Sequence, residues 1–171
     1  MTPYFLWAFQ QLVLLEGWET NDPNDLGGPT VLGISSKWWP EWHEKVMEAP
    51  NVQAKVGIAK CFYWHKYWKR LNLDAIGNRY VAYERFETTV HGETLGRKME
   101  KNVCNWFGVS TLKASYEKYG AFAVVVCWNL FQYDAYVDST QTRYFKGWQR
   151  RCWDNIRAYL KEMANKAGAS Q

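Results

Sequence analysis

The sequence lacks the long apolar runs and the leader pattern that mark membrane-spanning and secreted chains. Its longest apolar run, residues 121–128, ends at a polar Asn129, whereas a transmembrane helix needs about 20 apolar residues. The first four residues carry no basic side chain, and Gln10 and Gln11 break the apolar stretch behind them, which is unlike a signal peptide. We therefore expect no stable membrane insertion and no classical secretion.

Metal-binding and disulfide frameworks are also poorly represented. The chain has no Cys-x-x-Cys pair, and its three histidines are scattered. Structural zinc sites need clustered Cys and His ligands, so we expect no zinc site. The expected state is reduced, buried thiols for all four cysteines: Cys61, Cys104, Cys127 and Cys152.

The composition is that of a folded chain. Hydrophobic residues make up 47% and charged residues 22% of the 171 positions, too much apolar surface for disorder. This length predicts one domain. The net charge of +4 would suit an anionic polymer such as a cell wall or a nucleic acid, but does not choose between them.

Apolar residues recur at three- and four-residue spacing along most of the chain, and no segment alternates with period two. The pattern predicts a mainly α fold with at most a small hairpin. The expected helices are 4–16, 37–48 capped by Ser35 or Ser36, 50–68, one after Asn78, one from Gly92 to Gly108, one from Ser110 to Gly120, 121–137 and a last helix carrying Trp148, Cys152, Ile156, Tyr159 and Met163. Because 121–137 is apolar nearly all round, we expect it to be the central buried helix.

A carboxyl group at the end of the first helix has the setting of a general acid. Glu16 faces the negative end of the helix dipole, and Leu15 and Trp18 could desolvate it, so both effects predict a raised pKa. A protonated carboxyl group is what glycosidic cleavage requires, because the leaving oxygen must gain a proton. In the turn-rich segment 21–33, Asp25 could stay ionised and Thr30 could orient a water.

Plainer interpretations of this segment stay open. A helix-end Glu beside a loop Asp is ordinary surface chemistry, and Asp22 could simply brace its own turn. Weak calcium binding is disfavoured because the loop lacks the Asp-x-Asp-x-Asp-Gly pattern.

Residues 15–34 read Leu-Glu-Gly-Trp-Glu-Thr-Asn-Asp-Pro-Asn-Asp-Leu-Gly-Gly-Pro-Thr-Val-Leu-Gly-Ile. This resembles the signature of the family-108 glycoside hydrolases, which are lysozyme-like N-acetylmuramidases of phages and bacteria. That signature runs Glu-Gly-Gly-Tyr, then Asn-Asp-Pro-x-Asp-x-Gly-Gly-x-Thr-x-x-Gly-Ile. Residues 58–68, 81–92 and 145–151 are similar to further segments of the family.

The resemblance implies one lysozyme-like domain over residues 1–171. Residues 1–75 would hold the catalytic helix and loop, and residues 76–166 the helical C-terminal part. It implies Glu16 as catalytic acid, with Asp25 and Thr30 assisting water and the charged centre. The reaction would cleave the β-1,4 bond of bacterial peptidoglycan between N-acetylmuramic acid and N-acetylglucosamine. The resemblance implies no metal and no organic cofactor, and the favoured stereochemical outcome is inversion.

The biological setting follows from the same resemblance. We expect a monomeric phage endolysin that is made in the host cytoplasm and reaches the wall when a holin opens the inner membrane. A bacterial relative acting in wall remodelling is the other origin that the resemblance allows.

Three positions depart from the family pattern. Trp18 stands where Gly is usual, Glu87 where Asp is usual, and His91 where Asn is usual. The sugar could therefore be bound differently here. The predicted substrate-binding residues are Trp18, Asp22, Trp38, Trp39, Glu87 and His91, with Trp38 and Trp39 chosen because aromatic faces stack on sugar rings.

Two other classes compete with the enzyme. A non-catalytic wall-binding domain on the same scaffold would explain the departures. Nucleic-acid binding would use interleaved aromatic and basic residues in 62–70, although helical amphipathicity explains that stretch more simply. By default, the basic clusters are expected to be solvated faces: Lys66, Lys69, Arg70, Arg150 and Arg151.

Overall fold

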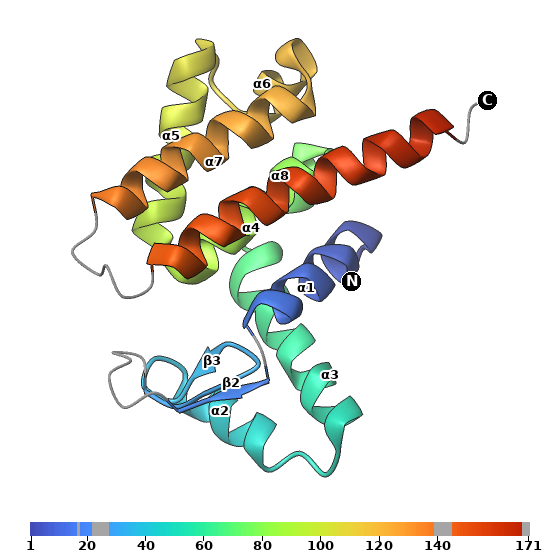
Figure 1. Ribbon diagram of the computed structural model, residues 1–171. Helices are drawn as coiled ribbons and strands as arrows, with labels where there is room; N and C mark the ends of the chain where they lie inside the picture. Colours follow the sequence, from blue (N-terminus) through green and yellow to red (C-terminus); the bar gives the residue numbers. More distant parts are fainter. Residues whose placement is uncertain (17, 22–27, 139–144, 169–171) are drawn as a thin grey trace. The chain divides into compact units, whose positions relative to one another are not determined.

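The computed structural model describes residues 1–16, 18–21, 28–138 and 145–168, and this part of the chain is mainly helical (Figure 1). The predicted fold class, a mainly α lysozyme-like domain with a small hairpin, is confirmed. Contacts group the chain into two compact units, Met1–Asp74 and Ala75–Gln171. The expectation that the whole chain folds as one domain stays a prediction.

The first unit begins with helix α1, Pro3–Glu16. Thr2 Oγ1 accepts a hydrogen bond from the Phe5 amide, 3.3 Å away, which caps the first turn. Among the α1 side chains that the structure describes, the buried ones are Phe5, Ala8, Phe9 and Leu12, the spacing that marks one apolar face.

A small antiparallel sheet follows α1, in the order β1 (Glu19–Thr20), β2 (Thr30–Val31) and β3 (Ile34–Ser35). Leu32 and Gly33 connect β2 to β3 with φ values of 49° and 73°. Positive φ at both central residues is the pattern of a type I′ hairpin turn, which glycine makes accessible. The buried Tyr63 donates from its hydroxyl to the Leu32 carbonyl, 2.9 Å away, and so ties the turn to the helical core.

Helices α2 (Pro40–Met47) and α3 (Val52–Tyr63) complete the first unit, with a π-helical turn at Trp64–Trp68 and a 3-10 turn at Leu73–Ile76. The predicted start of α2 at residue 37 is wrong. Ser35 Oγ instead accepts from the amides of Lys37 and Trp38 in a turn, and Pro40 opens the helix. Proline suits this position because its fixed φ is helical and its missing N–H is not needed there.

The second unit consists of helices α4 (Arg79–His91), α5 (Glu93–Phe107), α6 (Leu112–Tyr119), α7 (Ala121–Val137) and α8 (Phe145–Gly168). Asn78 caps α4, as predicted, by accepting from two backbone amides. Gly108 ends α5 with a φ of 63°, a left-handed conformation that favours glycine. Thr111, one residue beyond the predicted Ser110, caps α6.

The most deeply buried helix of this unit is α4, not α7. Every residue of α4 from Tyr80 to Thr89 is buried. By contrast, α7 exposes Phe122, Leu130 and Val137, and Leu130 is 60% exposed. The prediction that 121–137 is the central buried helix is therefore wrong, because hydropathy alone does not tell a helix with one open side from one that is covered all round.

The four cysteines are free thiols. Cys104, Cys127 and Cys152 are buried, as predicted, whereas Cys61 is exposed on α3.

Candidate functional site

Glu16, the predicted acid, is the last residue of α1. The described part of the chain includes its backbone but not its side chain. The last turn of α1 contains no basic residue, so no cation of that turn offsets the partial negative charge of its carbonyl groups. Two of the other predicted residues, Asp22 and Asp25, lie outside the described residues, and their roles stay predictions.

Pairing of β1 with β2 brings Thr30 back toward the end of α1. Thr30 lies opposite Thr20 in the ladder, and the Leu32 amide donates to the Trp18 carbonyl, 2.7 Å away. The strand that leaves α1 and the strand that leaves the turn-rich segment are thus held side by side. Glu16 precedes the first strand of this pair by only three positions.

Two of the predicted sugar-binding tryptophans expose large faces. Trp18 is 51% and Trp38 63% exposed, and Lys37 Nζ lies 5.0 Å from the Trp38 ring centre. Trp39 is half-buried, with its ring edge-on to that of Phe62 at 5.2 Å. Exposed aromatic faces suit sugar stacking, while the contacts of Trp39 also give it a packing role. Sugar contact by all three stays a prediction.

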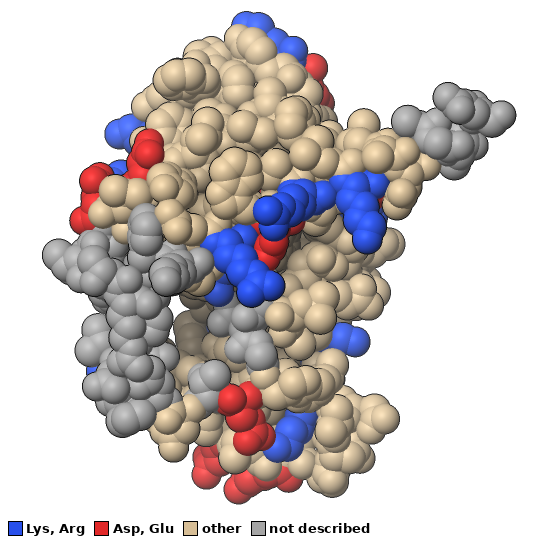
Figure 2. Space-filling model, in the orientation of Figure 1, with Lys and Arg blue, Asp and Glu red and all other residues tan. Residues whose placement is uncertain are grey.

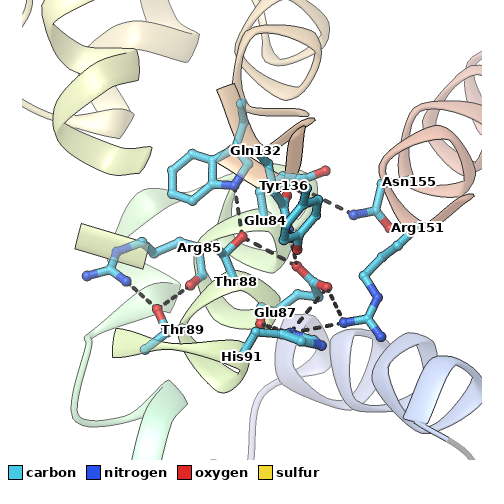
Figure 3. Close-up of polar contacts among 11 residues, drawn as sticks. Glu84, Arg85, Glu87, Thr88, Thr89, His91, Gln132, Tyr136, Arg151 and Asn155 are labelled. Atoms are coloured by element: carbon cyan, nitrogen blue, oxygen red, sulfur yellow. Dashed lines mark hydrogen bonds and ion pairs between the residues drawn. The ribbon is translucent and has the colours of Figure 1, made fainter. Parts of the chain in front are cut away.

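The second unit contains a buried polar cluster centred on Glu87 of α4 (Figure 3). The Glu87 side chain has no exposed surface. Arg151 Nη1 from α8 donates to Glu87 Oε1 at 3.1 Å. Oε2 accepts from the Thr88 hydroxyl and from Gln132 Nε2 of α7, each at 3.3 Å. These hydrogen-bond donors offset the hydration that the carboxylate loses on burial.

His91 lies at the same end of α4, four residues beyond Glu87. Its Nδ1 is 2.8 Å from the Glu87 backbone carbonyl oxygen and 3.1 Å from Arg151 Nη1. A carbonyl oxygen only accepts, so the 2.8 Å contact assigns the proton to Nδ1. The approach of Nη1 to Nδ1 is then a contact between two donors, which the nearby Glu87 carboxylate offsets.

These surroundings act on the pKa of Glu87 in opposite directions. Burial alone would raise the pKa, but the charges of His91 and Arg151 and the hydrogen bonds from Gln132 and Arg151 outweigh it. The pKa of Glu87 is therefore held below its ordinary value, and the group is ionised at neutral pH.

One turn earlier on α4, the pKa of Glu84 is shifted in the opposite direction. Asn129 Nδ2 of α7 and Asn155 Nδ2 of α8 donate to its two carboxyl oxygens at 2.9 Å and 3.2 Å. Both donors are uncharged, and burial, with a further contribution from Glu87, raises the pKa of Glu84 to about 8. At neutral pH the α4 pair therefore consists of one protonated and one ionised carboxyl group.

Arg151 corrects a prediction from the sequence. It was expected on a solvated face, but its side chain is only 13% exposed and it pairs with Glu87. The polar partners on α7 were also missed. A signal for them exists in the sequence: Asn129, Gln132 and Tyr136 recur at three- and four-residue spacing within a mainly apolar helix, which is typical of a buried polar stripe.

The structure leaves the predicted binding roles of Glu87 and His91 untested. The Glu87 carboxylate presents no surface to a ligand, whereas the His91 side chain is 20% exposed. Within the described residues, no group of three or more His, Cys, Asp or Glu side chains is placed to hold a metal ion.

Comparison with protein families decides the class of this chain. Residues 9–92, about half of its length, match the family model described as Glycosyl hydrolase 108. The chain belongs to glycoside hydrolase family 108. It is therefore a glycoside hydrolase with a carbohydrate substrate. The region matched to family 108 includes Glu16, Thr30, Glu87 and His91 and ends before Arg151. Neither curated proteins nor solved structures gave a match.

Proposed function

We propose that this family 108 chain is an N-acetylmuramidase, which hydrolyses the β-1,4 bond between N-acetylmuramic acid and N-acetylglucosamine in peptidoglycan. The observation that carries the proposal is the family match, because residues 9–92 include both the end of α1 and the turn-rich segment with its predicted acid and base.

In the proposed mechanism, Glu16 is the general acid. The position of Glu16 at the end of α1, in a turn without a basic side chain, favours the protonated form of a carboxyl group. Its proton passes to the glycosidic oxygen as the bond to the anomeric carbon breaks, and the ring develops oxocarbenium character. The departing sugar leaves as an alcohol.

Asp25 and Thr30 complete the reaction in this scheme. Asp25 takes a proton from the attacking water or stabilises the cationic centre, and the Thr30 hydroxyl orients that water. The β1–β2 pairing supports this part, since it returns Thr30 to the strand that follows Glu16. We favour inversion, in which water attacks the face opposite the leaving group; proton NMR of the first anomer released distinguishes it from retention.

The proposed substrate contacts include Trp18 and Trp38 as stacking faces, and the predicted contacts of Asp22, Trp39 and His91 belong to the same proposal. Because the carboxylate of Glu87 is fully buried, we assign it a positioning role: it holds Arg151 and His91, and a sugar would meet His91 rather than Glu87 itself.

The biological role we propose is host lysis by a phage, with release to the wall through a holin. Expression inside bacteria with and without a co-expressed holin tests it. Lysis that requires the holin supports this role, and lysis by the chain alone contradicts it.

Digestion of purified peptidoglycan, followed by borohydride reduction and mass spectrometry, tests the reaction. The proposal predicts fragments with reducible N-acetylmuramic acid ends. Reducible N-acetylglucosamine ends would assign a different glycosidase, and 1,6-anhydro ends a lytic transglycosylase. Folded protein that sediments with peptidoglycan without cleaving it would instead be a binding module.

A further inference from the structure

Helix α8 carries a row of exposed basic side chains. Arg150, Arg157 and Lys161 are seven and four residues apart, which places them within about 40° of one another around a helix. The side chains of Arg150 and Arg157 are 83% and 73% exposed, and Lys161 is exposed as well. Figure 2 shows Lys and Arg gathered on this face, along the helix that Figure 1 labels α8.

The positive charge of this row is only partly offset within the helix. Asp154 lies between its first two members, with its carboxylate oxygens 3.6 Å from Arg150 Nε and 3.5 Å from Arg157 Nη1. Surface ion pairs of this length contribute little and remain open to exchange with another anion.

An apolar row runs beside the basic one. Trp153 and Leu160 of α8, again seven residues apart, are 56% and 48% exposed. They lie about 60° around the helix from the basic row. Transfer of indole and leucine side chains out of water lowers their free energy, so two such exposed side chains beside a basic row are suited to contact with an apolar phase.

Helix α7, which lies beside α8 (Figure 1), exposes apolar side chains of its own. Phe122, 42% exposed, stacks on Tyr159 of α8 with ring centres 5.6 Å apart. Phe122 also lines an apolar pocket of about 460 Å³ with Trp106, Val126 and Leu130. The basic row and the two exposed apolar side chains beside it, Trp153 and Leu160, form an amphipathic surface, which we call the α8 face.

We propose that the α8 face is a peripheral docking surface for an anionic phospholipid bilayer. Arg and Lys would contact headgroup phosphates, for which they are matched in charge and donor geometry. Trp153 and Leu160 would enter the boundary between headgroups and acyl chains, the arrangement of interfacial amphipathic helices. An anionic glycan would use the charges but offers no apolar phase for Leu160.

Such docking is peripheral and does not require a spanning segment. Among the described residues, no helix is both long and apolar enough to cross a membrane. Surface binding of this kind is reversible and falls with ionic strength, because its charged part is screened within about 10 Å at 0.1 M salt.

Sedimentation with lipid vesicles tests the proposal. We compare phosphatidylcholine vesicles containing about 30 mol% phosphatidylglycerol with vesicles of phosphatidylcholine alone. The expected result is binding to the anionic vesicles only, weakened by salt. The double variant Arg157→Glu/Lys161→Glu should lose at least about 20-fold in partition coefficient, from roughly fivefold for each basic residue. Trp153→Ser/Leu160→Ser should also lose binding.

A matched control makes the test specific to the α8 face. Arg97→Glu/Lys98→Glu changes the net charge by the same amount at two exposed residues of α5. This control should bind anionic vesicles far more tightly than Arg157→Glu/Lys161→Glu, which we call the α8 charge variant. Equal losses in both variants would reduce the effect to net charge and overturn the proposal, as would absence of binding to anionic vesicles at low salt.

The same variants also test two other binding partners of this face: a second copy of the chain and the wall polymer. If Trp153→Ser/Leu160→Ser converts a dimer into a monomer in sedimentation velocity, the face is a self-interface and the proposal is wrong. If the α8 charge variant loses binding to lipid-free peptidoglycan but not to vesicles, the face binds wall polymer. Vesicle binding needs no glycoside hydrolysis, so it is judged independently of the proposed enzyme activity.

Discussion

Arg151 of α8 and Glu87 of α4 form a buried ion pair, with Nη1 and Oε1 3.1 Å apart across 64 positions of sequence. The pair joins the last helix of the chain to a helix within the region matched to the family. Around this pair, the Glu87 carboxylate is fully buried, whereas the side chains of Arg151 and His91 are 13% and 20% exposed.

Removal of Arg151 should destabilise the second unit strongly. Arg151→Met leaves the ionised Glu87 buried without its arginine, and loss of one partner of a buried pair costs about 3–5 kcal/mol. Urea unfolding measures the loss. The control is Arg150→Met, a change at the neighbouring residue, whose side chain is 83% exposed, where we expect less than about 0.5 kcal/mol. Similar effects of the two changes would show that the pair does not stabilise the fold.

The pH dependence of stability should carry the signature of Glu84. Its pKa is raised from 4.5 to about 8 in the folded state, so folding favours the protonated form. The associated stability is complete below pH 4.5 and is lost as the pH rises toward 8, by up to about 1.4 kcal/mol per pH unit. Glu84→Gln removes this titration. The free energy of unfolding of wild type minus that of the variant should therefore fall between pH 5 and 8; a constant difference would contradict the raised pKa.

Gly96 should be intolerant of even a methyl group. A Cβ there would lie 2.5 Å from Thr89 Oγ1 and 3.2 Å from the Thr89 Cα, because α5 packs closely on α4 at this point. We expect Gly96→Ala to destabilise by about 1–3 kcal/mol. At Gly57 of α3 an added Cβ meets nothing within 4 Å, so Gly57→Ala should stabilise by about 0.5–1 kcal/mol. Thermal unfolding of both variants checks the opposite signs.

Substitutions at Trp38 and Trp39 should differ in their effects on substrate binding and on stability. Trp38 is 63% exposed, so Trp38→Ala should leave stability within about 0.5 kcal/mol and raise KM for peptidoglycan fragments. Trp39→Ala removes a ring that packs on Phe62 and should lower stability as well. A Trp38→Ala enzyme with unchanged KM would exclude Trp38 from the glycan-binding surface.

Local signals predicted most of the fold. Asn78, Gly108 and Gly120 mark helix ends in both the sequence and the structure, because caps depend on a few neighbouring residues. The small hairpin also followed from its glycines. The π-helical turn at Trp64–Trp68 was not anticipated, since its backbone geometry arises within a continuous helical pattern.

Contacts between residues far apart in the sequence could not be predicted for the buried polar cluster. The partners of Glu84 and Glu87 from other helices come from α7 and α8, 45 to 71 positions away. Helical periodicity alone does not reveal which distant side chain meets a carboxylate. The assignment of Arg151 to a solvated face was wrong for this reason. Glu16 and the turn-rich segment were found by a motif, whose spacing is read directly along the chain.

In the proposed mechanism Glu16 supplies the catalytic proton, and kcat/KM for Glu16→Gln on solubilised peptidoglycan tests this role most directly. Glu19→Gln, a change at another acidic residue close by in the sequence, is the control. We expect a loss of well over ~100-fold for Glu16→Gln, with unfolding midpoints close to wild type and activity nearly unchanged in the control. Activity retained by a folded Glu16→Gln enzyme would exclude Glu16 as the catalytic acid and assign that role to another residue.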